Sequence, residues 1–232
     1  MLKYIILDFG GVIAGPIIKG NWDITSKLLE LVDVSKIDKE KFIEVRKKYG
    51  DILSEKITTL DEEVDMFYRF YNGILKDLGI ENYDYISHEV AVDRTYNLEK
   101  YKIFDNIYEE LANLSDKYKL ILLTDNWPCL FPFLKKYSLD SFFDKVYCSS
   151  FYGIEKKDKV FFDYPINDYS IKPGEAIFID DNDSNLDIAM EKGLDVLLMD
   201  RYGGAKSKHN IVHDLKSLTC NMEKLTEKSR NK

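Results

Sequence analysis

The sequence predicts an α/β fold in which short parallel strands alternate with helices and a block of helices is inserted early in the chain. Several short apolar runs, each of the length of a buried strand, end in polar groups, and helical segments separate them. After the first run comes a long stretch without such a strand end, in which apolar residues recur at helical spacing. The 232 residues suffice for one large domain or for a domain with an insert.

The first apolar run, Tyr4 to Leu7, is followed at once by Asp8 and then by the glycine pair Gly10 and Gly11. This pattern indicates a strand that delivers one carboxylate into a tight turn. An acid at that point lies at the carboxyl edge of the sheet, where open α/β folds bind their ligands. Asp8 could equally cap the turn that follows, and it is the remaining strand ends that favour a functional role.

Three further apolar runs end in polar groups of the kind that bind phosphate. They cover residues 120–123, 145–148 and 176–179, and they lead to Thr124 and Asp125, to Lys156 and Lys157, and to Asp180 and Asp181. Adjacent carboxylates such as Asp180 and Asp181 repel each other unless a cation lies between them, and hard oxygen ligands favour Mg²⁺. A fifth strand is predicted over Asp195–Met199.

The order acid, hydroxyl, lysine and acid pair resembles the four motifs of the haloacid dehalogenase (HAD) superfamily. Receiver domains use the same residue types, but their acid pair comes first and their lysine last, which does not fit. The resemblance implies a Rossmann-like parallel sheet core, residues 1–15 and 97–232, and an all-helical cap, residues 16–96. In this family the cap closes over the active site and selects the substrate.

The resemblance also assigns roles to the strand-end residues. It implies that Asp8 is a nucleophile that forms an aspartyl-phosphate, and that Asn185, in a DDxxxN spacing, supports the acid pair. The implied catalytic residues are Asp8, Thr124 and Lys156; the substrate-binding residues are Thr124, Asp125, Lys156 and Lys157; and the Mg²⁺ ligands are Asp8, the carbonyl of Gly10, Asp180 and Asp181.

Three positions depart from the family pattern. Gly10 stands where related phosphatases usually carry an acid–base aspartate, so the leaving-group proton must come from solvent or from another group. Asp125 stands where many relatives have asparagine, and Lys157 replaces the proline that usually follows the motif lysine. Either Lys156 or Lys157 could therefore reach the site, and both could also be ordinary surface lysines.

The helix predictions start with Thr59 and Glu62, a capping-box pair that opens a helix ending at Gly79. Weaker helical periodicity covers 24–32, 38–49 and 83–90. Later helices are expected through Ile103 to Leu114, from Pro128, after Asp158 with a break or kink at Pro165, over Ser184–Lys192, and around Val212 to Leu218.

Composition excludes several functions. Acidic residues outnumber Lys and Arg by 41 to 33, and the resulting net charge of −8 argues against nucleic-acid binding. Cys129, Cys148 and Cys220 lack the CxxC spacing of a zinc site and do not form a disulfide framework. No apolar run reaches the roughly 18 residues of a membrane span. We expect a soluble, cytoplasmic protein without a membrane partner, of undetermined oligomeric state.

The preferred function is that of a Mg²⁺-dependent phosphatase acting on a small phosphorylated metabolite, whose identity the sequence does not reveal. Two alternatives remain open: a HAD-fold protein without turnover that binds a phosphate ligand or a partner, and a haloacid dehalogenase. Trp22 and Trp127 follow the first two motifs, and they either pack in the interior or line the mouth between cap and core.

Overall fold

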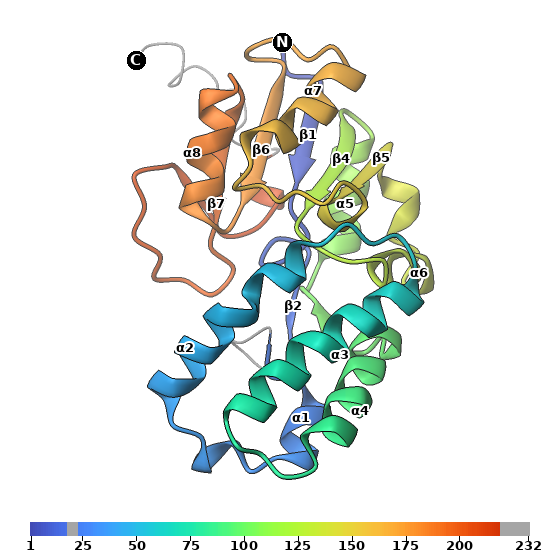
Figure 1. Ribbon diagram of the computed structural model, residues 1–232. Helices are drawn as coiled ribbons and strands as arrows, with labels where there is room; N and C mark the ends of the chain where they lie inside the picture. Colours follow the sequence, from blue (N-terminus) through green and yellow to red (C-terminus); the bar gives the residue numbers. More distant parts are fainter. Residues whose placement is uncertain (18–22, 219–232) are drawn as a thin grey trace.

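The computed structural model describes residues 1–17 and 23–218, so that Trp22 and Cys220 lie outside the described residues. Its core is a parallel six-stranded sheet with the order β5-β4-β1-β6-β7-β8 (Figure 1). The strands are β1 (Tyr4–Leu7), β4 (Lys119–Thr124), β5 (Lys145–Cys148), β6 (Ala176–Asp180), β7 (Asp195–Met199) and β8 (Ile211–Val212). This architecture confirms the predicted fold class.

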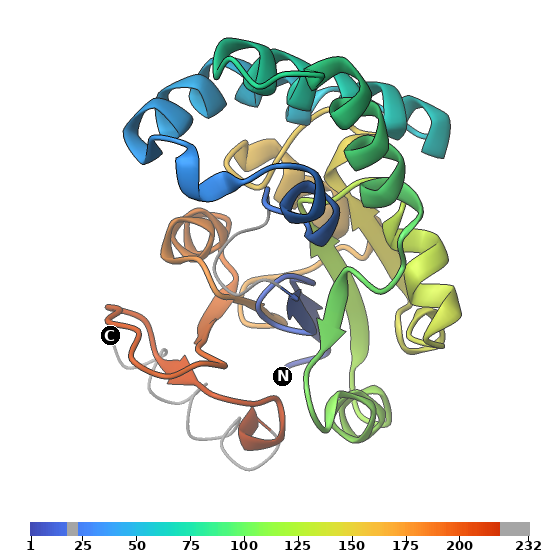
Figure 2. The ribbon, with the colours of Figure 1, turned by 90° about the horizontal axis from the view of Figure 1, so that it is seen from below.

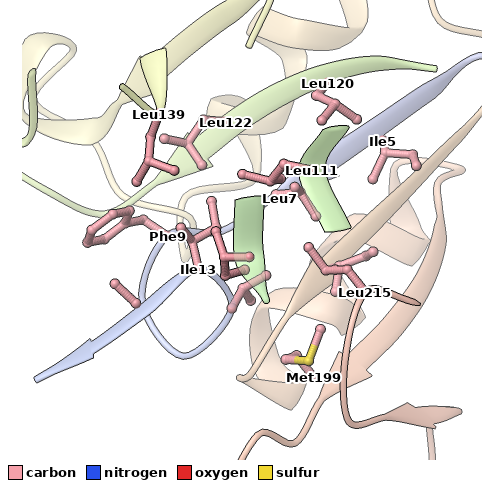
Figure 3. Close-up of a cluster of buried hydrophobic side chains, with 14 of the residues drawn as sticks. Ile5, Leu7, Phe9, Ile13, Leu111, Leu120, Leu122, Leu139, Met199 and Leu215 are labelled. Atoms are coloured by element: carbon pink, nitrogen blue, oxygen red, sulfur yellow. The ribbon is translucent and has the colours of Figure 1, made fainter. Parts of the chain in front are cut away.

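Helices cover both faces of the sheet because its strands are apolar on both sides. Ile5 and Leu7 of β1 pack against α5 (Ile107–Ser115) and α6 (Leu130–Lys136), in the cluster that Figure 3 shows. Ile6 points to the opposite face, where α8 (Asp183–Glu191) and the 3₁₀ turn η5 (Lys159–Phe162) contribute apolar side chains. The central strand is therefore buried on both sides, and its carboxyl end is fixed in place.

A helical insert with its own apolar cluster lies at one end of the sheet, below it in the view of Figure 1. It enters through β2 (Ala14–Pro16) and returns through β3 (Tyr101–Ile103), which pair antiparallel. Its helices are α1 (Ser26–Leu31), α2 (Lys39–Tyr49), α3 (Leu60–Asp77) and α4 (Tyr83–Tyr96), joined by the 3₁₀ turns η1 (Val34–Lys36) and η2 (Gly50–Ser54), and Figure 2 shows them as an arc. The Thr59–Glu62 capping box opens α3 as expected. The domain limits at 16 and 96 stay a prediction.

Several element predictions were wrong in detail. Ile103 belongs to β3, and the helix expected to include it starts only at Ile107. Pro165 does not break a helix, because it lies in the first turn of α7 (Asp163–Asp168), where a missing N–H costs no intrahelical bond. Val212 is in strand β8, and only residues 216–218 of the helix expected there are helical, while residues beyond 218 lie outside the described part.

The insert contacts the core through four side chains that we call the boundary cluster: the buried Glu63, Arg94 and Cys129 and the half-buried Lys100. Glu63 of α3 accepts a hydrogen bond from the Cys129 backbone N–H at 2.7 Å. The Lys100 Nζ lies 2.9 Å from the Cys129 sulfur, and the Arg94 guanidinium stacks over the Trp127 ring at 5.5 Å. These contacts tie α3 and α4 to the chain segment that follows Thr124.

A second set of contacts joins the η2 segment to the loops after β4 and β5. Trp127 Nε1 donates to the Leu53 carbonyl at 3.1 Å, and the Ile57 N–H donates to the Ser150 carbonyl at 2.9 Å.

Across the described residues, no helix has the length and apolarity that crossing a membrane requires.

Candidate active site

Asp8 is placed by the sheet itself. Its backbone N–H donates to the Ile179 carbonyl at 3.0 Å, which extends the β1–β6 pairing by one residue. Because successive residues of extended chain face opposite sides, Phe9 points into the apolar core while the Asp8 side chain faces away from it. Gly11 then turns the chain at φ +70°, a conformation that glycine adopts without strain. The Asp8 carboxylate is buried, with 7% of the residue exposed.

Asp180 ends β6 beside it and is fully buried. The Asn182 N–H donates to its Oδ1 at 2.8 Å, and the Asn185 side-chain amide donates to the same carboxylate at 3.1 and 3.2 Å. The DDxxxN spacing thus places Asn185 as expected, since one turn of α8 carries its side chain back over the acid loop. These donors hold Asp180 in one orientation.

Asp181 completes the group, and its carboxylate lies directly over Gly11. A Cβ on Gly11 would come within 2.0 Å of Asp181 Oδ2, so only glycine leaves room for the acid here. One carboxylate oxygen from each of Asp8, Asp180 and Asp181 lies within 4.8 Å of the others. We call these three residues the acid cluster.

Lys156 neutralises part of this charge. Its Nζ lies 2.9 Å from Asp8 Oδ1 and 2.6 Å from Asp180 Oδ2, and its side chain is almost fully buried. Burial acts against the ammonium, but Asp180 and Asp8 outweigh it and raise the pKa of Lys156, so the lysine stays charged. Lys157 is exposed and pairs with Glu155 at 2.5 Å, so of the two lysines only Lys156 meets the acid cluster.

The remaining negative charge shows in the pKa values of the acids. Burial raises the pKa of Asp8 to about 6, with the ammonium of Lys156 opposing the shift and Asp180 adding to it. Asp181 is partly exposed, but the protein removes enough of its hydration to raise its pKa to about 7, and the charges of Asp8 and Asp180 add to this. The acid cluster therefore carries an excess of negative charge, and this excess favours a bound cation.

Thr124 and Asp125 follow β4 at the same edge of the sheet. Thr124 is buried, and its hydroxyl stabilises the Asp8 carboxylate by a hydrogen bond that acts to lower the pKa of Asp8. Asp125 Oδ1 accepts a hydrogen bond from the Lys156 N–H at 2.9 Å, which links the loop after β4 to the lysine loop. The ends of four segments, far apart in sequence, therefore meet at Asp8.

The acid cluster fits a divalent cation on one further observation. Asp8 Oδ1 is buried and accepts no aligned hydrogen bond from a described residue, although the Lys156 ammonium is nearby. A buried carboxylate oxygen left in this way has lone pairs available to a metal ion. Gly10 lies in the same turn, in a β-bridge with Ala14, and its role as a carbonyl ligand stays a prediction.

The chain resembles known proteins over most of its length. The family model of the haloacid dehalogenase-like hydrolases matches residues 5–199, most of the chain. The chain belongs to this family. This haloacid dehalogenase-like hydrolase is 25% identical over 213 residues to the D-ribitol-5-phosphate phosphatase of Bacteroides thetaiotaomicron, covering 84% of this chain and 90% of the relative.

Solved structures of similar fold include a dehalogenase and a family member bound to magnesium and phosphate. The 2-haloacid dehalogenase of Pseudomonas syringae superimposes with a TM-score of 0.67 at 16% identity, covering 97% of this chain and 99% of that one. A HAD family enzyme of Bacteroides thetaiotaomicron in complex with magnesium and inorganic phosphate gives a TM-score of 0.55 at 20% identity, covering 88% and 97%. At these identities the likeness shows the shared fold.

Sequence reasoning missed two features of this hydrolase. The Asp125 link to the Lys156 N–H joins residues 31 positions apart, and no local pattern signals it. Glu63 belongs to the first turn of α3, where an acid is ordinary, and nothing in the sequence distinguishes it from its exposed neighbours. The close approach of Asp181 to Gly11 had a signal, since the paired glycines after Asp8 mark a turn that another chain segment approaches.

Proposed function

We propose that this hydrolase is a Mg²⁺-dependent phosphatase of small phosphorylated metabolites, with Asp8 as the nucleophile. The observation that carries the proposal is the meeting of the acid cluster with Lys156 and Thr124 at one edge of the sheet. A carboxylate that attacks phosphorus must overcome repulsion between two anions, so it needs positive charge and hydrogen-bond donors beside it. Both are present around Asp8.

Each residue of the site has its own role in the proposed reaction. Asp8 attacks phosphorus and forms an acyl-phosphate, while the Lys156 ammonium and the Thr124 hydroxyl bind phosphoryl oxygens and stabilise their growing charge. Asp180, held by Asn185, keeps Lys156 in place. Asp8, Asp180 and Asp181 would hold a Mg²⁺ ion, which when bound supplies charge neutralisation for the phosphoryl group. Asp125, next to Thr124, would contact the rest of the substrate.

Two alternatives compete with this proposal. A haloacid dehalogenase uses the same nucleophile position on this fold, but a reaction without a metal ion gives no reason to bring Asp180 and Asp181 within reach of Asp8. A phosphate-binding protein without turnover would also keep the acid cluster. The absence of an acid at Gly10 would then explain its lack of turnover. The likeness to a sugar-alcohol phosphatase makes D-ribitol 5-phosphate one natural test substrate.

The experiment measures inorganic phosphate released from a panel of phosphomonoesters, including D-ribitol 5-phosphate, with Mg²⁺ and with EDTA. We expect release with Mg²⁺ and none with EDTA. Chloride release from 2-chloropropionate without phosphate release would establish the dehalogenase instead. If neither product forms but Mg²⁺ and inorganic phosphate bind together in calorimetry, the protein is a binding module and the proposal fails.

A further inference from the structure

The turn at Gly10 provides no acid to protonate a leaving group, so another group must do so if the reaction is to act on poor leaving groups. The acid cluster is already committed: Asp180 is held by Lys156 and Asn185, and Asp181 lies against Gly11 beside Asp8. One further acid, Asp125, lies at the same edge of the sheet.

One oxygen of the Asp125 carboxylate is held by a hydrogen bond, and the other is not. It directly follows Thr124, whose hydroxyl contacts Asp8, and its Oδ1 accepts the Lys156 N–H at 2.9 Å. That single bond fixes the carboxyl against the lysine loop. Among the described residues no donor reaches its Oδ2, and the residue is exposed to solvent, so this oxygen is accessible to a ligand.

The charged groups that face Asp125 come from two segments: Lys156 and Glu155 from the lysine loop, and Asp8 from the end of β1. Partial desolvation by the surrounding loops raises the pKa of Asp125 to about 7, with Lys156 opposing and the charges of Asp8 and Glu155 adding. Asp125 can therefore exist in either protonation state near neutral pH, which suits proton transfer.

Other acids of the lysine loop and of the insert already form hydrogen bonds or ion pairs. Glu155 accepts from the Ser54 hydroxyl at 2.7 Å and pairs with Lys157, so its carboxylate faces the insert and the surface. In the insert, Asp23 pairs with Arg46 at 2.7 Å and Glu55 with Arg69 at 2.6 Å. The hydrogen bond and charge of Arg69 lower the pKa of Glu55, so this carboxyl is a poor proton donor.

We propose that Asp125 is the general acid–base residue of this enzyme, in place of the acid missing at Gly10. The inference rests on the proposed phosphatase function. As the Asp8 oxygen bonds to phosphorus and the ester P–O bond breaks, protonated Asp125 gives its proton to the leaving oxygen. The resulting Asp125 carboxylate then takes a proton from water as that water bonds to phosphorus. The Asp8–phosphorus bond breaks, phosphate leaves, and Asp8 and protonated Asp125 are regenerated.

The test compares two esters of similar bulk, 4-nitrophenyl phosphate and benzyl phosphate, in wild type and Asp125→Asn. The asparagine keeps an oxygen for the Lys156 N–H but cannot transfer a proton. Because kcat/KM reports the steps through phosphorylation of Asp8, the benzyl ester should lose about 10²–10⁴-fold. The nitrophenyl ester has a leaving group that departs without protonation, and its kcat/KM should change little.

Two further readouts separate proton transfer from a structural role. In the wild type, kcat/KM for benzyl phosphate should fall as pH rises through the pKa of Asp125, because the acid is then lost, and Asp125→Asn should lack this fall. Asp125→Glu retains the acid and should recover part of the benzyl activity. As a control, at a pH well below the pKa of Asp125, Glu155→Gln in the neighbouring loop should leave the ratio of the two esters at its wild-type value.

The outcomes distinguish the two claims. If Asp125→Asn lowers both esters equally, or neither, and the pH dependence is unchanged, Asp125 is not the acid–base residue and the phosphatase function stands. If the wild type releases phosphate from no phosphomonoester at all, the phosphatase function fails and the role of Asp125 falls with it. Should Asp125→Asn not fold, an Asp125→Glu variant with no preference against the benzyl ester and a shifted pH profile supports the proposal, and one with an unshifted profile overturns it.

Discussion

The acid cluster and the boundary cluster both contain buried charged side chains, but their charge balances are opposite. In the acid cluster three carboxylates face the one ammonium of Lys156. In the boundary cluster the carboxylate of Glu63 lies with two cations, Arg94 and Lys100. An excess of buried negative charge is costly unless a cation or protons compensate it, whereas the second group supplies its own counter-charges. The difference supports the proposal that the acid cluster binds a cation, and it is consistent with a structural role for the boundary cluster.

The largest expected effect is on turnover, from Asp8→Asn. The amide can neither form an acyl-phosphate nor balance a cation, so phosphate release should fall on the order of 10⁴- to 10⁶-fold, as for loss of a nucleophile in other hydrolases. The fold should persist, since the variant removes one of three crowded carboxylates. Phosphate release is measured with circular dichroism as the check on folding. Wild-type turnover in this variant would show that Asp8 is not the nucleophile.

The neighbouring lysines provide a matched test of charge balance. Lys156→Met leaves the acid cluster without its ammonium, and the free energy of unfolding without metal should fall by about 3–5 kcal/mol. Added Mg²⁺ should restore part of that stability because the ion replaces the lost charge. Lys157→Met changes an exposed residue and should stay within about 0.5 kcal/mol of wild type. Urea unfolding with and without Mg²⁺ measures both variants, and equal effects would contradict the charge argument.

Substitutions at two glycines distinguish an effect on Mg²⁺ affinity from an effect of backbone strain. Gly11 and Gly79 both adopt positive φ, but only at Gly11 would a Cβ collide with Asp181, while Gly79 has open space. We expect Gly11→Ala to raise the Mg²⁺ concentration for half-maximal phosphate release about 10–100-fold, the effect typical of displacing a group that orients metal ligands. Gly79→Ala should cost stability alone. A Mg²⁺ dependence that shifts equally in both variants would mean that strain, not Asp181, explains the change.

The smallest effect is expected in the boundary cluster, from Glu63→Gln. Burial raises the pKa of Glu63 above its ordinary value, against the opposing charge of Lys100. A raised carboxyl pKa means that the folded state holds the proton more tightly than the unfolded chain, so wild-type stability falls as pH rises above the unfolded pKa. Relative to wild type, Glu63→Gln should therefore gain stability as pH rises from about 4 toward neutral.

This difference is read from urea unfolding at several pH values, and the Mg²⁺ dependence of phosphate release should not change. A shift in Mg²⁺ dependence would contradict the separation of the two clusters. So would a stability difference that runs in the opposite direction with pH.

The two clusters also differ in how far the sequence could predict them. Each member of the acid cluster directly follows a short apolar run, and parallel strands bring such positions to one edge of the sheet, so Asp8, Asp180 and Asp181 could be placed together. Glu63 and Cys129 are 66 residues apart, and their contact depends on how the insert docks on the core. No periodic pattern in the sequence predicts how the insert docks on the core.

Local elements divide in the same way. Strong signals such as the Thr59–Glu62 capping box and the run Asp195–Met199 predicted α3 and β7 correctly. Strands β3 and β8 have three and two residues, too few to show an alternating pattern, and they form because a partner strand is already present. One residue of each strand, Ile103 in β3 and Val212 in β8, was therefore predicted to be helical.

The most direct test of the central claim, that the acid cluster holds Mg²⁺ and activates Asp8 toward phosphorus, is a crystal structure of the wild type with Mg²⁺ and beryllium fluoride, a mimic of the phosphoryl group on a carboxylate. The account predicts the beryllium fluoride on an Asp8 oxygen, within reach of Lys156 and Thr124, and one Mg²⁺ ion bound by Asp8, Asp180 and Asp181. An adduct on another carboxylate, or an ion bound away from all three acids, would contradict it.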